Sequence, residues 1–171
     1  ETLLSQASEE DKVVLLHDKI TRDVATLERQ IAFFNYELEL HTRVREHGAI
    51  TKEELREMME RHLRSYLGKG VTIRPEDGYS FVFIPHFRYG FYVYTYTYGL
   101  LMSSLMHVRL KDNSEFKKNI DAFLTSGGRD TVEKIFKDIG IDPLKVETFK
   151  EALALHEADI KEFKRITKHL K

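Results

Sequence analysis

The chain has 171 residues, 42% of them hydrophobic, and is therefore long enough to bury a core of its own. Its 27 basic and 28 acidic side chains nearly cancel, which argues against nucleic acid or an anionic membrane as a partner. The absence of cysteine excludes disulfides, thiolate metal sites and cysteine nucleophiles within the chain. The same absence is compatible with a reducing compartment, so we expect a cytoplasmic location. No apolar run approaches the roughly 20 residues of a membrane-spanning helix, and no charged-then-apolar leader opens the chain. Because the first residue is Glu1 rather than Met, we expect a trimmed, processed or partial chain.

The first elements are predicted to form a helical hairpin over residues 9–67. Apolar residues recur every three to four positions up to Gly48, which indicates one long amphipathic helix or two helices in line. Thr51 followed by Glu54 matches a capping box, which marks the start of the next helix.

An irregular loop is expected over residues 69–90, because glycines and prolines interrupt this stretch, with a short β-like run from Tyr79 to Ile84. Residues 91–111 then lack proline and become almost wholly apolar toward their end, which predicts a buried helix. The tyrosines that open this run alternate with the period of a strand, and that alternative remains open.

The remainder, residues 114–170, is predicted to be helical, with Ser114 and Asp130 as caps and a long amphipathic helix from Val146 to Leu170. The expected fold is thus a mainly α-helical single domain over residues 1–171.

The stretch from Ile84 to Gly99 carries the strongest chemical signal, because it contains one histidine and five of the eight tyrosines. A phenol can pack against apolar neighbours and still donate a hydrogen bond, so this cluster could present several neutral donors to one bound group. In a helix, Tyr92 and Tyr96 would share one face. The alternative is that these tyrosines only pack their rings and bond to backbone.

Familiar catalytic motifs are absent. The chain lacks HExxH, GxSxG, SxxK, GxGxxG and the P-loop pattern. Its only His-Glu pair, His156-Glu157, is followed by Ile160 where a second zinc ligand would stand, so we interpret His156 as a part-buried helix residue.

Two carboxylate and histidine pairs leave open a helical carboxylate site: Glu37 with His41, and Glu60 with His62. Neither pair has the Glu-x-x-His spacing of di-iron bundles. For Glu37 and His41 we favour a salt link at the surface or beside a site.

The stretch IPHFRYGFYVYTYTYGLL, residues 84–101, resembles the His-Phe…Phe-Tyr-x-Tyr-x-Tyr segment of the oligoendopeptidase F family, relatives of thimet oligopeptidase. Further stretches are similar to the C-terminal region of that family, in the same order: FFNYELELH at 33–41, FLTSGG at 123–128, and IGIDP at 139–143 with Ala-Leu at 152–153. The resemblance spans essentially the whole chain.

This resemblance implies the C-terminal helical part of a zincin-like, zinc-dependent oligoendopeptidase that hydrolyses short peptides. In that family HExxH and a later glutamate bind zinc, and the resemblance puts both upstream of Glu1. We therefore expect zinc in the full-length enzyme, none bound by this chain alone, and no activity from the isolated chain. The implied partners are an oligopeptide substrate and the missing N-terminal part of the same enzyme.

The resemblance also implies site residues. His86 and Tyr92 would line the substrate and bind the oxyanion or the peptide backbone, with Tyr96 the next catalytic candidate one helical turn on. The lower-ranked substrate-binding candidates are the other tyrosines of the stretch: Tyr89, Tyr94 and Tyr98.

A second hypothesis, from another class, is a non-catalytic helical module that binds peptides or a partner through its tyrosine face. If the chain is instead the back part of a peptidase, helices that normally pack against the missing half would expose apolar surface, so self-association is expected.

Overall fold

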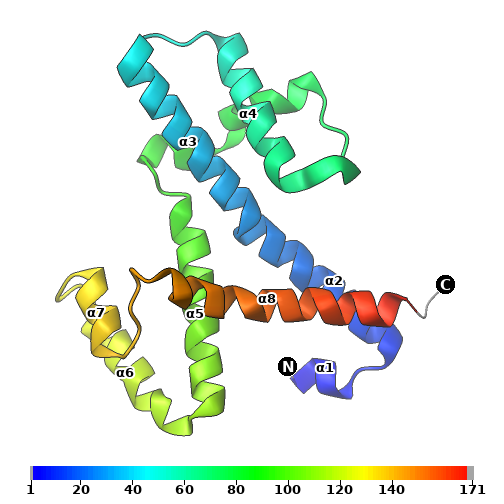
Figure 1. Ribbon diagram of the computed structural model, residues 1–171, viewed down its shortest axis with the longest axis vertical. Helices are drawn as coiled ribbons and strands as arrows, with labels where there is room; N and C mark the ends of the chain where they lie inside the picture. Colours follow the sequence, from blue (N-terminus) through cyan, green and yellow to red (C-terminus); the bar gives the residue numbers. More distant parts are fainter. Residues whose placement is uncertain (1, 169–171) are drawn as a thin grey trace. The chain divides into compact units, whose positions relative to one another are not determined.

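A computed structural model describes residues 2–168, and all the regular structure in this range is helical (Figure 1). The elements, in chain order, are α1 (Thr2–Gln6), α2 (Glu9–Thr26), α3 (Glu28–His47), α4 (Lys52–Leu67), the 3-10 helices η1 (Gly68–Gly70), η2 (Pro75–Phe83) and η3 (Pro85–Tyr89), α5 (Tyr94–Asp112), η4 (Ser114–Phe116, also 3-10), α6 (Lys117–Ser126), α7 (Val132–Asp138) and α8 (Val146–Thr167). The prediction of a mainly α-helical fold is confirmed.

The chain divides into two compact units. The central unit is Thr21–Tyr98, and the terminal unit combines Glu1–Ile20 with Gly99–Lys171. Within residues 2–168, no helix is both long and apolar enough to cross a membrane.

The first long amphipathic stretch consists of two helices in line, α2 and α3, which are separated at Leu27. Backbone hydrogen bonds continue across this residue, because Leu27 donates to Asp23 at 2.7 Å and Ile31 donates to Leu27 at 3.0 Å. Helix α3 stops at Gly48, whose φ of 84° lies in the left-handed region that glycine adopts easily.

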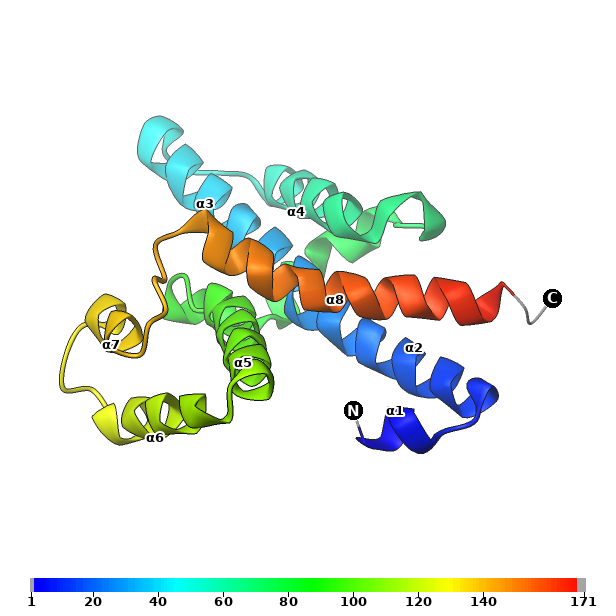
Figure 2. The same cartoon turned by 60° about the horizontal axis from the view of Figure 1, so that its bottom comes forward.

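Helix α4 begins with the predicted capping box. Glu54 N donates to the Thr51 hydroxyl at 3.2 Å, and Thr51 N donates to the Glu54 carboxylate at 2.9 Å. Helices α3 and α4 lie side by side (Figures 1 and 2), and Glu39 of α3 accepts from Arg61 of α4 at 2.6 Å. These contacts hold the two helices as a hairpin.

The core of the central unit forms between α3, α4 and the segment that follows them. Its buried side chains are Phe33, Tyr36, Met58, Met59, Leu63, Ile73 and Val93. The ring of Tyr36 packs against Phe81 and Phe87, with centroids 6.0 and 5.3 Å away. Each large side chain buried in this way stabilises the fold by about 1.5–3 kcal/mol, so the core fixes the 3-10 segment against the hairpin.

The β-like interpretation of residues 79–84 is wrong, because residues 79–83 belong to the 3-10 helix η2 and Ile84 is its C-cap. Asp77 caps η2 by accepting from the Arg74 amide at 2.8 Å. Gly78 lies so close to α4 that a Cβ there would be 2.6 Å from the Arg56 carbonyl oxygen. A lone strand would leave its backbone groups unpaired, whereas i to i+3 bonds satisfy them locally.

In the terminal unit, α8 crosses the apolar part of α5 (Figure 2). Ser104 of α5 lies 3.3 Å from Nε2 of His156, and Arg109 donates to the Gly140 carbonyl at 2.9 Å. The buried residues of α5 here fall in two adjacent pairs one turn apart: Leu101, Met102, Leu105 and Met106. The predicted burial thus applies to one face of the helix.

Two predicted caps are displaced by one residue. Asn113 rather than Ser114 accepts from the Glu115 amide at 3.0 Å. Thr131 rather than Asp130 accepts from the Lys134 amide at 3.3 Å. The predicted end of the last helix at residue 170 lies outside the described residues, and α8 ends at Thr167.

Candidate functional site

The histidine and tyrosine stretch folds as a short helix, a tight bend and a long helix. His86 and Tyr89 belong to η3, after which Gly90 and Phe91 both have positive φ, of 56° and 54°. Helix α5 begins two residues after Tyr92. The strand alternative for the tyrosines is therefore excluded.

This path brings His86, Tyr92 and Tyr96 together. The rings of His86 and Tyr92 stack with centroids 5.6 Å apart and an interplanar angle of 5°. Tyr96 meets both rings edge-on, at 5.3 Å from His86 and 5.7 Å from Tyr92, and its hydroxyl oxygen lies 2.8 Å from His86 Nε2. Tyr89 completes the group, 6.2 Å from Tyr92. We call these four residues the His–Tyr cluster.

The other two candidate tyrosines lie outside the cluster. Tyr94 packs edge-on against Phe34, with ring centroids 6.1 Å apart. Tyr98 is half-buried, and burial, together with the nearby Tyr94, raises the pKa of its phenol. The structure thus groups Tyr96, and neither Tyr94 nor Tyr98, with His86 and Tyr92.

The cluster is open to ligands and rich in donors. Tyr89, Tyr92 and Tyr96 are 71%, 45% and 38% exposed in this chain. Desolvation, followed by the nearby Tyr92 phenol, raises the pKa of Tyr96 above its ordinary value of 10.0, which keeps this phenol protonated and able to donate. When His86 Nε2 accepts the Tyr96 hydrogen, Nδ1 carries the other ring hydrogen and is the donor of that imidazole.

Glu37 is more deeply buried than its sequence pattern predicted, and its closest partner is a distant backbone amide. Its side chain is buried, with only 1% of the residue exposed, so the predicted salt link to His41 is present beside the candidate site rather than at the surface, with 4.0 Å between Glu37 Oε1 and His41 Nε2. The main partner of Oε1 is instead the Phe91 amide, which donates at 2.6 Å. No local pattern predicts a contact between residues this far apart in the sequence.

The second carboxylate and histidine pair is divided between different partners. Glu60 accepts from Arg64 at 2.6 Å, whereas His62 lies 2.8 Å from Glu39. The interpretation of His156 as a part-buried helix histidine is confirmed, because it is 7% exposed and lies beside Ser104. Among residues 2–168, no three His, Asp or Glu side chains gather closely enough to hold a metal ion.

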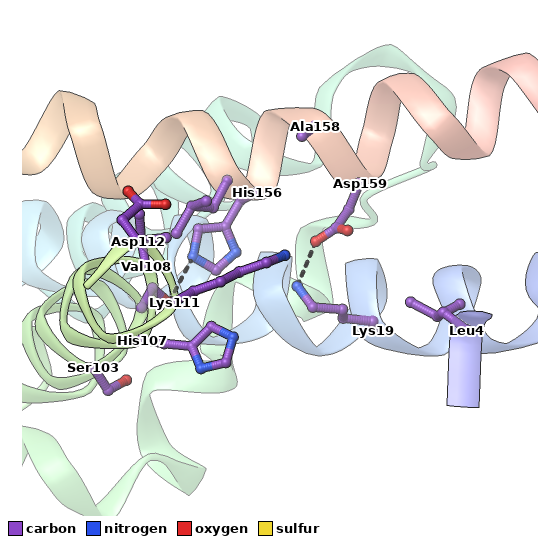
Figure 3. A pocket seen from close by; sticks show the side chains of 12 residues that line it. Leu4, Lys19, Ser103, His107, Val108, Lys111, Asp112, His156, Ala158 and Asp159 are labelled. Carbon is purple, nitrogen blue, oxygen red and sulfur yellow. Dashed lines mark hydrogen bonds and ion pairs between the residues drawn. The ribbon is translucent and has the colours of Figure 1, made fainter. Parts of the chain in front are cut away.

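A cavity of about 870 Å³ in the terminal unit was not foreseen from the sequence. Lys19, His107, Lys111, His156 and Asp159 are among its lining residues (Figure 3). The Lys19 ammonium lies 2.6 Å from the Asp159 carboxylate, so these opposite charges neutralise one another. None of the predicted site residues lines this cavity.

The profile that describes Peptidase family M3 matches residues 2–155. The chain belongs to this family. It is 26% identical to the oligopeptidase PepF of Bacillus subtilis (strain 168) over 164 residues, which cover 95% of this chain and 24% of that protein. An oligoendopeptidase F homolog from Borreliella burgdorferi is 25% identical over 168 residues, which cover 97% of this chain and 28% of the homolog.

A solved structure agrees with this assignment. The crystal structure of oligoendopeptidase-F from Enterococcus faecium matches with a TM-score of 0.87 at 25% identity, covering 98% of this chain and 32% of that one. The resemblance to the oligoendopeptidase F family is therefore confirmed, and the M3 segment described here spans about a quarter of the length of these curated relatives.

Proposed function

We propose that this M3 chain forms the C-terminal portion of a zinc-dependent oligoendopeptidase and contributes substrate-binding and oxyanion-stabilising groups to it. His86, Tyr92 and Tyr96 are the proposed catalytic residues, and Tyr89 is a proposed contact for the bound peptide. The observation that carries the proposal is the His–Tyr cluster, in which one imidazole and two phenols pack within 5.7 Å of one another, measured between ring centroids.

The chemistry of peptide hydrolysis supports these roles. Negative charge develops on the carbonyl oxygen as the peptide bond is attacked, and donors already aimed at that oxygen lower the barrier. A neutral phenol supplies a hydrogen bond without releasing its proton, and the raised pKa of Tyr96 keeps that group neutral at physiological pH. The stacked rings restrict the directions in which these donors point.

Tyr94 and Tyr98 remain lower-ranked substrate contacts in this proposal. Tyr94 is well exposed but lies against Phe34 rather than against His86. Tyr98 is half-buried, whereas Tyr92 and Tyr96 are exposed, so it ranks below them.

Zinc enters the proposal through the family alone. Residues 2–168 bring no three His, Asp or Glu side chains together, so the described residues do not fit a zinc site. We therefore propose that residues outside this chain hold the zinc, and that the chain itself binds the peptide and donates hydrogen bonds. The 171-residue chain alone should then be inactive.

The test compares this chain with the full-length protein that contains it. Both are assayed for cleavage of a short internally quenched peptide, with and without added zinc. We expect cleavage by the full-length protein only, and a loss of activity there for Tyr92→Phe. Robust zinc-dependent cleavage by the purified 171-residue chain would sink the proposal.

The alternative, a non-catalytic peptide-binding module, draws on the same exposed phenols. It predicts that the full-length protein binds peptides without cutting them, so the cleavage assay separates the two. Exposed apolar side chains such as Phe83, Leu124 and Leu144 favour self-association of the chain, which gel filtration measures. A cytoplasmic location is proposed and is tested by cell fractionation.

A further inference from the structure

Glu37 stands out because it is a buried carboxylate whose closest partner is a backbone amide of the loop that bears the site. It lies on α3 and is only 1% exposed. Its Oε1 accepts from the Phe91 amide at 2.6 Å. Phe91 immediately precedes Tyr92.

Phe91 needs such support, because its φ of 54° places a bulky residue in the left-handed region. The residue before it, Gly90, is also left-handed, with φ of 56°. Glycine adopts this conformation readily, but phenylalanine does so only when its surroundings impose it. The hydrogen bond to Glu37 is one such constraint.

The ring of Phe91 is held by the same face of α3. Phe34 and His41 lie 5.7 and 5.0 Å from it between ring centroids. Phe34, Glu37 and His41 are spaced by three and four residues, which places them along one face of the helix. Beyond Tyr92, Val93 is fully buried. Tyr92 is therefore fixed from both sides.

This arrangement is unfavourable for the carboxylate itself. Within the described part of the chain, Glu37 Oε2 is buried and has no hydrogen-bond partner, and His41 Nε2 lies 4.0 Å from Oε1. A buried carboxyl oxygen without a hydrogen-bond partner lowers stability, and the persistence of such a group calls for a structural reason.

We propose that Glu37 is a positioning residue that holds Phe91 in its left-handed conformation and thereby keeps Tyr92 stacked on His86. The consequence for catalysis rests on the function proposed above. The effect on the conformation of the loop does not rest on that function, because it follows from the hydrogen bond between Glu37 and Phe91 alone.

The first arm of the test measures amide hydrogen exchange at Phe91 in the full-length protein, resolved by fragmentation mass spectrometry. Glu37→Ala should speed exchange on the order of tenfold to a hundredfold, the range expected when a part-buried amide loses its hydrogen-bond acceptor. Glu37→Gln keeps an oxygen acceptor and should stay close to wild type. Glu39→Ala is the matched control, because it removes a glutamate of the same helix that bonds Arg61 and His62 instead.

The second arm measures peptide cleavage by the same variants. Glu37→Ala should lower kcat by about tenfold or more with little change in KM, because a displaced transition-state donor affects the chemical step. Glu37→Gln should restore most of kcat, and Glu39→Ala should leave it unchanged. Combining Glu37→Ala with Tyr92→Phe should be no worse than Tyr92→Phe alone, because both act through one phenol.

Unchanged Phe91 exchange in Glu37→Ala overturns the positioning role. An equal loss of kcat in Glu39→Ala would also overturn it, because that result would indicate general destabilisation. The role is overturned too if the double variant has a lower kcat than Tyr92→Phe alone. If Tyr92→Phe is fully active, the proposed catalytic role of Tyr92 fails instead, and the exchange arm still decides whether Glu37 holds the loop.

Discussion

The bond between Tyr96 and His86 determines what each group offers to a ligand. With 2.8 Å between the hydroxyl and Nε2, the phenol orients the imidazole, and the two rings meet at 87°. Replacement of Tyr96 by phenylalanine keeps the ring and removes only this hydroxyl. The substitution therefore removes the hydrogen bond to His86 and keeps the packing of the ring.

We expect Tyr96→Phe to lower kcat/KM of the full-length protein by about tenfold to a hundredfold, because the His86 imidazole loses the hydroxyl that orients it. Tyr66→Phe removes a hydroxyl from α4, outside the cluster, and serves as the control. Steady-state kinetics on a quenched peptide give the comparison. Equal activity of the two variants would contradict a role for the Tyr96 hydroxyl.

A different result is expected at Tyr36, whose ring is buried in the core. Its hydroxyl has no hydrogen-bond partner among the described residues. Tyr36→Phe removes this unsatisfied group and should leave the free energy of unfolding unchanged or raise it by about 1 kcal/mol. Tyr36→Ala should lower it by roughly 3–5 kcal/mol, because it empties the core. Urea unfolding of both variants tests this, and a clear loss in Tyr36→Phe would mean that the hydroxyl is bonded.

Residue chemistry explains which site contacts could be foreseen. The grouping of Tyr92 with Tyr96 follows from helical spacing, and both are named by the family motif. The Glu37 to Phe91 hydrogen bond depends on how α3 packs against a loop far along the chain, and the sequence around either residue does not indicate this contact. Tertiary contacts of this kind leave no periodic signal in the sequence.

At the scale of elements, the segment between α4 and α5 shows what decides local structure. The capping box of α4 is a local pattern, and it could be predicted from Thr51 and Glu54 alone. The 3-10 form of η2 could not be predicted, because it depends on the approach of Gly78 to Arg56 across the fold.

Gly78 and Gly70 offer a matched pair of substitutions in this segment. Gly78→Ala would place a Cβ 2.6 Å from the Arg56 carbonyl oxygen, and we expect a loss in unfolding free energy of about 1–3 kcal/mol or more. A Cβ at Gly70 would meet nothing within 4 Å, so Gly70→Ala should be neutral or stabilising by up to about 1 kcal/mol. Thermal unfolding compares them, and equal melting temperatures would show that η2 packs less closely than described.

At the scale of the whole molecule, tyrosines make stability sensitive to alkaline pH. Burial raises the pKa of Tyr36, Tyr66 and Tyr98 above the ordinary value of 10.0, and desolvation does the same for Tyr96. The folded state therefore keeps these protons at a pH at which the unfolded chain releases them. The unfolding free energy should be steady below about pH 10 and fall as pH rises through the raised values.

Urea unfolding at a series of pH values measures this dependence. Tyr36→Phe removes the most buried of these phenols and should make the decline shallower. Lys134 and Lys137 also have raised pKa values, through hydrogen bonds to acidic neighbours, and act in the same direction. If the unfolding free energy of Tyr36→Phe falls with pH as steeply as that of wild type, the pH dependence comes from groups other than Tyr36.

The helical class and the family were predictable for the whole chain, because amphipathic periodicity and the order of several motifs do not depend on distant contacts. The division into two compact units was not predicted. Its boundaries fall inside α2 and α5, where hydrophobic periodicity runs on without interruption. A periodic pattern records which face of a helix is buried and leaves open what buries it.

The ring stacking of the His–Tyr cluster makes the protein its own optical probe. The chain has no tryptophan, so its eight phenols dominate near-ultraviolet absorption and fluorescence, and three of them belong to this cluster. Stacked rings in fixed orientations produce strong near-ultraviolet circular dichroism. A peptide that enters the cluster should change this signal, so binding can be followed without any attached label.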